Sequence, residues 1–342
     1  MNDPQIIGGS QPSWPPPFQQ AGAFRREWEH LQRLALVTGL DHQRVIMPSR
    51  GYVSVGDLNL HYVEWLSPQA AVNVLFLHGG ALQARTWDAA CMFLRDSFRC
   101  TALDLRGHGE SDWSPSRDYT LTHHAEDIAM FIAARRLGPV VLVGHSLGGL
   151  AALLVASAHT EAIAGLVLVD IAPTMNKQAT GRVRDFIRSR QGFNSADELL
   201  EHVLRFAPRR RKDLLAGSLV HNIQELPDGT LAWKYDPSHF AAEGIRPADE
   251  ELWACVAAIS CPILLVRGER SRVVAAETAE RLVSQARDAR VCTVERAGHT
   301  VQGDAPRDLA DLIRDFVTDK IGGTAGSPRP GCAAARGAAA GA

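Results

Sequence analysis

The chain has 342 residues, and its 36 Lys and Arg against 38 Asp and Glu give a formal net charge of -2. This length supports one large hydrophobic core or two small ones. The balance of charges gives no reason to expect nucleic acid or an anionic membrane as a partner. No apolar run is long enough to span a bilayer, and the first residues lack the pattern of a secretory signal peptide. We therefore expect a cytoplasmic protein that binds neither nucleic acid nor membrane.

The two ends of the chain differ in composition from its middle. Residues 1–20 are rich in Pro, Gly and Gln, and we predict that they are disordered. The stretch "AGAFRREWEHLQRLALVTG" is typical of a helix, so residues 21–49 are predicted to form an N-terminal extension helix. The tail, residues 321–342, is a low-complexity run of Gly, Ala and Pro, and we predict disorder there too.

Between the ends, short apolar runs alternate with helical patterns. The runs "YVSV" and "LHYVEW", joined by a Gly-Asp turn, predict an antiparallel hairpin. Six later runs are rich in β-branched residues and do not alternate, as expected for strands buried on both faces: "NVLFL", "CTALDL", "VVLVG", "GLVLVD", "PILLVR" and "RVCTVE". This order predicts an α/β fold with a mostly parallel eight-stranded sheet and helices on both faces. The core is expected to span residues 50–173 and 243–320.

The stretch "VVLVGHSLGGLAALLVA" places a G-x-S-x-G pattern, Gly144 to Gly148, between a buried strand and a helix. In this nucleophile elbow the serine sits on a strained turn, and small residues two positions away on either side let strand and helix pass close together. The helix N-terminus behind Ser146 favours developing negative charge. Ser146 is therefore the predicted nucleophile.

A second motif, "LFLHGGALQARTW", ends a strand at a Gly-rich turn that can direct a backbone N–H into the site. The amide of Gly80, or that of Ala81, is expected to form an oxyanion hole with the amide of Leu147. We predict that His78 braces this loop by hydrogen bonds. His108, in the "LDLRGHGESDW" loop, is also predicted to be structural.

The general base is predicted from "VERAGHTVQGDAP", where His299 follows the final strand on a loop that carries Gly298. A histidine there can reach the serine at the carboxyl edge of the sheet, and its pKa near neutrality suits proton transfer.

Four motifs in this order, LHGG, DLRGHGESD, GHSLGG and a late AGH, resemble the α/β-hydrolase superfamily over about residues 50–320, apart from one insert. Within it, the chain is similar to the capped esterase, lactonase and cofactor-free haloperoxidase-like branch. The resemblance implies a serine hydrolase that acts on a small molecule through a Ser-His-acid triad, with neither cofactor nor metal.

The acid of this triad departs from the usual pattern. An aspartate is expected about three residues after Gly268, and Ser271 stands there. Asp170 ends the strand "GLVLVD" and should lie at the same carboxyl edge of the sheet as the serine, so it is the predicted acid. Glu269 and Asp304 are alternatives, each less well placed. If none of the three pairs with the histidine, the chain is a non-catalytic binding protein.

Residues 174–242 interrupt the alternation of strands with helical segments, and Ser195 with Glu198 forms a capping box. In the family that the chain resembles, such an insert forms a helical cap over the serine. We expect Trp233 and Tyr235, together with Ala81 and His145, to contact the substrate. The predicted reaction is hydrolysis of an ester, lactone or related acyl bond, and hydrolysis of a C–C or amide bond by the same triad is the alternative within the enzyme class.

Overall fold

A computed structural model describes residues 21–67, 69–208, 210, 212–240, 246–322 and 332–334. The predicted disorder of residues 1–20 and of most of the tail falls outside these ranges. None of the helices within them combines the length and the apolar character needed to cross a membrane.

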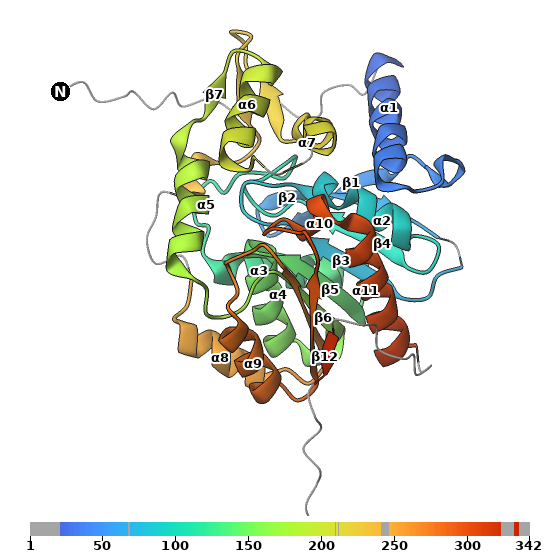
Figure 1. The fold of residues 1–342 in the computed structure, drawn as a ribbon, viewed down its shortest axis with the longest axis vertical. Coiled ribbons are helices and arrows are strands. Elements are labelled where there is room, and N and C mark those ends of the chain that lie inside the picture. The colour runs from blue at the N-terminus through green and yellow to red at the C-terminus, as the bar shows by residue number, and fades with distance from the viewer. Residues whose placement is uncertain are drawn as a thin grey trace, which may run out of the picture.

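The described residues form a nine-stranded sheet in the order β1-β2-β4-β3-β5-β6-β10-β11-β12 (Figure 1). The six strands from β4 to β11 in this order are parallel, whereas the pairs β1–β2, β2–β4 and β11–β12 are antiparallel. The eight predicted strands are all present: β1 (Ser49–Val55), β2 (Leu58–Trp65), β3 (Asn73–Leu77), β4 (Arg99–Leu103), β5 (Val140–His145), β6 (Ile163–Val169), β10 (Ile263–Gly268) and β11 (Ala289–Val294). The ninth strand, β12 (Cys332–Ala334), lies in the predicted tail and was not expected.

The sheet is buried on both faces, which explains why its strands do not alternate in polarity. Leu75 and Leu77 of β3 pack in one hydrophobic cluster, whereas Val74 and Phe76 pack in another. The first cluster is completed by α3 (Leu121–Arg135), α4 (Leu147–Ala158), α8 (Asp249–Ala258) and α9 (Ala276–Gln285). The second is completed by α1 (Ala21–Thr38), α2 (Asp88–Leu94) and α11 (Pro306–Lys320). The fold is thus the predicted sheet between two helical layers.

The insert contains helices and also a small sheet. Its helices are α5 (Lys177–Ser189), α6 (Ala196–Phe206) and α7 (Lys212–Leu219), and its strands are β7 (Gly192–Phe193), β8 (Ile223–Glu225) and β9 (Leu231–Trp233). Ser195 Oγ accepts a hydrogen bond from the amide of Glu198 at 3.2 Å, as the capping box predicts. Glu198 accepts one from the amide of Asn194 at 2.7 Å, so the reciprocal bond is made one residue earlier than in the standard box. These elements share a separate hydrophobic cluster above the sheet (Figure 1).

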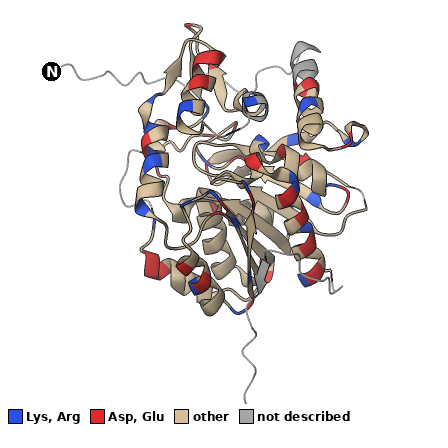
Figure 2. Ribbon diagram, in the orientation of Figure 1, with Lys and Arg blue, Asp and Glu red and all other residues tan. Residues whose placement is uncertain are grey.

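The extension helix α1 contacts both α2 of the core and α7 of the insert. Figure 2 shows both basic and acidic side chains on α5 and on α11. Charges of both signs therefore share these helical surfaces.

Candidate active site

Ser146 occupies the sharp turn between β5 and α4 at the carboxyl edge of the sheet. Its φ of 51° lies in the left-handed region, which is unusual for a residue other than glycine. A Cβ atom on Gly144 would lie 2.5 Å from the carbonyl oxygen of Gly148, and a Cβ atom on Gly148 would lie 2.5 Å from the carbonyl oxygen of His78. The elbow therefore needs both glycines, as the motif predicts.

His299 and Asp170 form a direct pair. His299 Nδ1 lies 2.8 Å from Asp170 Oδ2, and the Asp170 side chain is only 1% exposed. Asp170 follows the last residue of β6 and also has a positive φ, 51°. The carboxylate accepts a hydrogen bond from Nδ1–H, which leaves Nε2 of His299 as the basic nitrogen. This is the pairing expected for Asp170.

The two alternative acids are engaged elsewhere. Glu269 is exposed and accepts a hydrogen bond from the amide of Arg296 at 2.7 Å. Asp304 accepts one from the amide of Gly298 at 2.8 Å and lies 3.3 Å from Nε of Arg210. Asp304 therefore holds the loop that carries His299 but does not bind its ring.

Ser271 has a role that the sequence did not reveal. It stands where an aspartate is expected, and its hydroxyl donates a hydrogen bond to Asp170 Oδ2. Ser271 Oγ also accepts a bond from the amide of Val273 at 3.2 Å, while the amide of Gly268 donates to Asp170 Oδ1 at 3.0 Å. The loop after β10 thus binds the carboxylate that it does not supply. The serine in the usual place of the aspartate was the only sequence signal for this contact.

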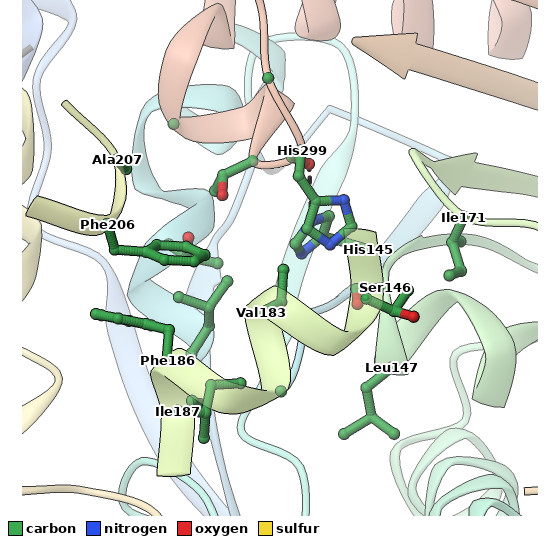
Figure 3. A pocket seen from close by; sticks show the side chains of 18 of the residues that line it. His145, Ser146, Leu147, Ile171, Val183, Phe186, Ile187, Phe206, Ala207 and His299 are labelled. Atoms are coloured by element: carbon green, nitrogen blue, oxygen red, sulfur yellow. Dashed lines mark hydrogen bonds between the residues drawn. The ribbon is translucent and has the colours of Figure 1, made fainter. Parts of the chain in front are cut away.

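Ser146 and His299 line the same cavity, and Figure 3 shows both side chains at its wall, with the ring of His145 beside that of His299. Between these two described side chains, Ser146 and His299, no hydrogen bond forms in this structure. Catalytic hydrogen bonds are often long without substrate and tighten in the bound complex. The arrangement therefore supplies a nucleophile and an oriented imidazole on one cavity wall.

The Gly-rich turn lies beside the elbow. Gly80 and Ala81 line the cavity next to Leu147, and Ala81 has a φ of 60°. Among the described residues, no hydrogen bond occupies the amides of these three residues, which are the expected oxyanion-hole donors. In contrast, the amide of Gly148 donates to the carbonyl of His78 at 3.0 Å and so fixes the elbow to the turn.

His78 and His108 brace loops, as expected. His78 Nδ1 lies 2.8 Å from the carbonyl oxygen of Gly79, and its Nε2 accepts a hydrogen bond from the amide of Leu105 at 3.0 Å. His108 Nδ1 lies 2.9 Å from the carbonyl oxygen of Arg106. Burial lowers the pKa of both rings, so both are neutral at pH 7.

His145 positions the loop that carries the base. Its Nε2 lies 2.9 Å from the carbonyl oxygen of His299, and the two rings are 4.6 Å apart between centroids. Burial, followed by the nearby His299, holds the pKa of His145 well below its usual value. A neutral ring therefore donates Nε2–H to this carbonyl and fixes the backbone of the predicted base.

The cavity between core and insert has a volume of about 1770 Å³. Trp233 and Tyr235 line it as expected, but both also support the insert. Trp233 Nε1 donates to the carbonyl of Arg190 at 2.9 Å, and the Tyr235 hydroxyl donates to the carbonyl of Ile187 at 2.9 Å. Sequence reasoning missed the apolar side chains of α5 and α6 that Figure 3 shows at the cavity: Val183, Phe186, Ile187 and Phe206.

Comparisons with known proteins identify the family of this chain. The model of the "Alpha/beta hydrolase family" matches residues 74–312. The esterase Rv0045c of Mycobacterium tuberculosis is 34% identical over 257 residues, which cover 72% of this chain and 83% of the esterase. Its crystal structure superposes with a TM-score of 0.70, covering 85% of this chain and 97% of that one.

A second relative is the 2-(acetamidomethylene)succinate hydrolase of Mesorhizobium japonicum, which is 27% identical over 71% of this chain and 87% of its own. A crystal structure of an E-2-(acetamidomethylene)succinate hydrolase has a TM-score of 0.72 and 25% identity, covering 79% of this chain and 99% of that one. The relatives are thus named for hydrolysis.

Proposed function

Because this chain belongs to the alpha/beta hydrolase family and is a hydrolase, we propose that it cleaves an ester, lactone or related acyl bond of a small to medium-sized molecule. Ser146 attacks the acyl carbon, His299 takes the proton from its hydroxyl, and Asp170 stabilises the imidazolium. The amides of Gly80 and Leu147 bind the oxyanion. The observation that carries the proposal is the 2.8 Å contact between His299 Nδ1 and the buried carboxylate of Asp170.

The proposed reaction has two steps. Ser146 Oγ forms a bond to the acyl carbon as its proton moves to His299 Nε2, and the leaving alcohol then takes that proton. A water molecule attacks the acyl-enzyme, again giving its proton to His299, and the acid product leaves as Ser146 regains its proton. The cycle consumes one water and one ester, and every proton passes through His299.

The cavity and the relatives support the substrate class. Apolar side chains from α5 and α6 line the cavity, where an acyl or alcohol chain can pack. The esterase name of the M. tuberculosis relative favours an oxygen ester over an amide or C–C bond. No cofactor is needed for this chemistry.

Fluorophosphonate labelling tests the nucleophile. The wild-type chain should be labelled on Ser146, and Ser146→Ala should lose labelling and roughly 10⁴–10⁶ of ester turnover. Ser284→Ala is the matched control, because that exposed hydroxyl caps only its own helix at the carbonyl of Arg281, 2.8 Å away. Unchanged ester turnover in Ser146→Ala would refute the mechanism. An unlabelled wild-type chain without activity would favour a binding protein.

A further inference from the structure

Three side chains that can bind a metal converge outside the active site. His30 of α1, Asp88 at the start of α2 and His221 after α7 place candidate ligand atoms within 4.8 Å of one another. The three residues come from the extension helix, the core and the insert. In Figure 1, α1 and α2 lie on the same side of the molecule, and α1 contacts both α2 and α7.

The two imidazoles have lone pairs to offer. His221 Nε2 is buried and has no hydrogen-bond partner in the described part of the chain. His30 Nε2 lies 3.9 Å from Asp88 Oδ2, which is beyond hydrogen-bond distance. The two rings meet edge to face with centroids 4.9 Å apart. The neutral imidazole is the form that binds a metal.

Asp88 supplies the negative charge of the cluster. Its side chain is fully buried, and Nε of Arg85 lies 2.8 Å from each of its oxygens. Burial raises the pKa of this carboxyl, and the ion pair with Arg85 opposes that rise. Each carboxylate oxygen keeps a second lone pair beyond the one that Arg85 uses. Arg85 also pairs with Glu27, so that the charge of its guanidinium is shared between two carboxylates.

We propose that His30, Asp88 and His221 bind one divalent transition metal ion, of the class of Zn²⁺, Co²⁺ or Ni²⁺. Ligand atoms about 2.0–2.1 Å from a tetrahedral ion are about 3.3 Å apart. The candidate ligand atoms, which now lie within 4.8 Å of one another, would therefore move closer together on binding. Two imidazoles with one carboxylate favour these ions over Mg²⁺ and Ca²⁺, which prefer oxygen ligands only. Three protein ligands would leave the remaining coordination position to water.

The site would fasten the insert to the core. Asn222 follows His221 directly, and its Oδ1 accepts a hydrogen bond from Gln83 Nε2 at 2.9 Å. Gln83 in turn accepts a bond from the amide of Arg85 at 2.7 Å, at the start of the turn that leads into α2. These hydrogen bonds connect the insert to the core close to the Gly-rich turn. A metal ion bound by His221 and Asp88 would add a second connection between the same two segments.

Zn²⁺ titration of the whole, chelator-treated chain by calorimetry tests the site. We expect one ion per chain and an increase in melting temperature with added Zn²⁺, because binding to the folded state alone stabilises it. His221→Asn and His30→Asn should each weaken Zn²⁺ binding by about 100-fold or more, since even changes around metal ligands cost about 10–100-fold. Asp88 is left intact because its loss would leave the buried Arg85 with only one carboxylate partner, that of Glu27.

His42→Asn is the matched control, since this exposed histidine on the turn after α1 lies outside the cluster. It should bind Zn²⁺ with wild-type affinity. With Co²⁺ as the probe, visible absorption of a tetrahedral ion should appear in the control and disappear in both cluster variants. Unchanged Zn²⁺ affinity in both cluster variants, or loss of binding in His299→Asn instead, would overturn the proposal. Ser146 labelling is independent of these outcomes.

Discussion

The hydroxyl of Ser271 donates a hydrogen bond to Asp170 Oδ2, the same oxygen that lies 2.8 Å from Nδ1 of His299. In the family that the chain resembles, the loop after β10 usually carries the acidic residue. Here the acidic residue, Asp170, follows β6, and the loop after β10 carries Ser271, which donates a hydrogen bond to it. The register of β6 against β10 explains why the acidic residue can follow either strand. Val169 and Val266 are paired across the parallel strands, so the residues that follow them lie side by side at one edge.

Asp170→Asn should lower kcat by roughly 10²–10⁴, because an amide favours the wrong imidazole tautomer and does not stabilise the imidazolium. Steady-state kinetics with an ester substrate measures the effect. Glu269→Gln is the matched control and should change kcat by less than about threefold, since Glu269 is exposed and binds only the amide of Arg296 among the described residues. An equal loss in both variants would exclude Asp170 as the acid.

Ser271→Ala should lower kcat by about tenfold and leave KM nearly unchanged. The variant removes one of the hydrogen bonds that hold the Asp170 carboxylate, and a bond to a charged group contributes about 1.5 kcal/mol or more. Ser271→Thr keeps the hydroxyl and should retain most of the activity. A kcat loss that Thr does not rescue would point to packing and not to the hydrogen bond.

The fold and the meeting of His299 with Asp170 could be predicted because they depend on local patterns. The unalternated β-branched runs identify strands buried on both faces, and Asp170 is placed by the rule that parallel strands end at one edge. The contact of Ser271 with Asp170 depends on the path of a loop, which no periodicity encodes. The meeting of His30 with His221 depends on how the insert packs on the extension helix. β12 could not be predicted because a three-residue strand carries no pattern of its own.

Phe206→Ala should raise KM for esters with long acyl chains and change the free energy of unfolding by less than about 1 kcal/mol. Its side chain lines the cavity but is 41% exposed, and it stacks on Phe186 with ring centroids 4.3 Å apart. A series of p-nitrophenyl esters of increasing chain length measures the change. A uniform change for all chain lengths would exclude a selective contact.

Trp233→Ala, in contrast to Phe206→Ala, should lower the stability of the protein. This buried indole belongs to the hydrophobic cluster of the insert and donates to the carbonyl of Arg190, so its loss should destabilise the protein by about 3–5 kcal/mol. Urea unfolding at constant pH measures this loss. If Trp233→Ala instead unfolds like the wild type, the indole acts only at the cavity.

The free energy of unfolding should decrease as the pH falls below about 6.5, because His239 is buried among other histidines. Burial lowers the pKa of His239 to about 4. Asp236 opposes this shift and His78 adds to it, while the rings of His108 and His124 lie 5.0 and 5.1 Å away. The pKa values of His108 and His124 are also lowered by burial.

The sign of this pH dependence follows from whether the folded or the unfolded chain binds more protons. Above pH 6.5 His239 is neutral in both the folded and the unfolded chain, so its contribution is constant. Between about pH 6.5 and pH 4 only the unfolded chain binds the proton, and the fold loses about 2 kcal/mol from this residue by pH 5. Urea unfolding of the wild type and of His239→Gln at pH 8 and pH 5 measures the difference. From pH 8 to pH 5 the free energy of unfolding of the variant should fall by about 2 kcal/mol less than that of the wild type. An equal fall in both would show that His239 takes up its proton in the folded state.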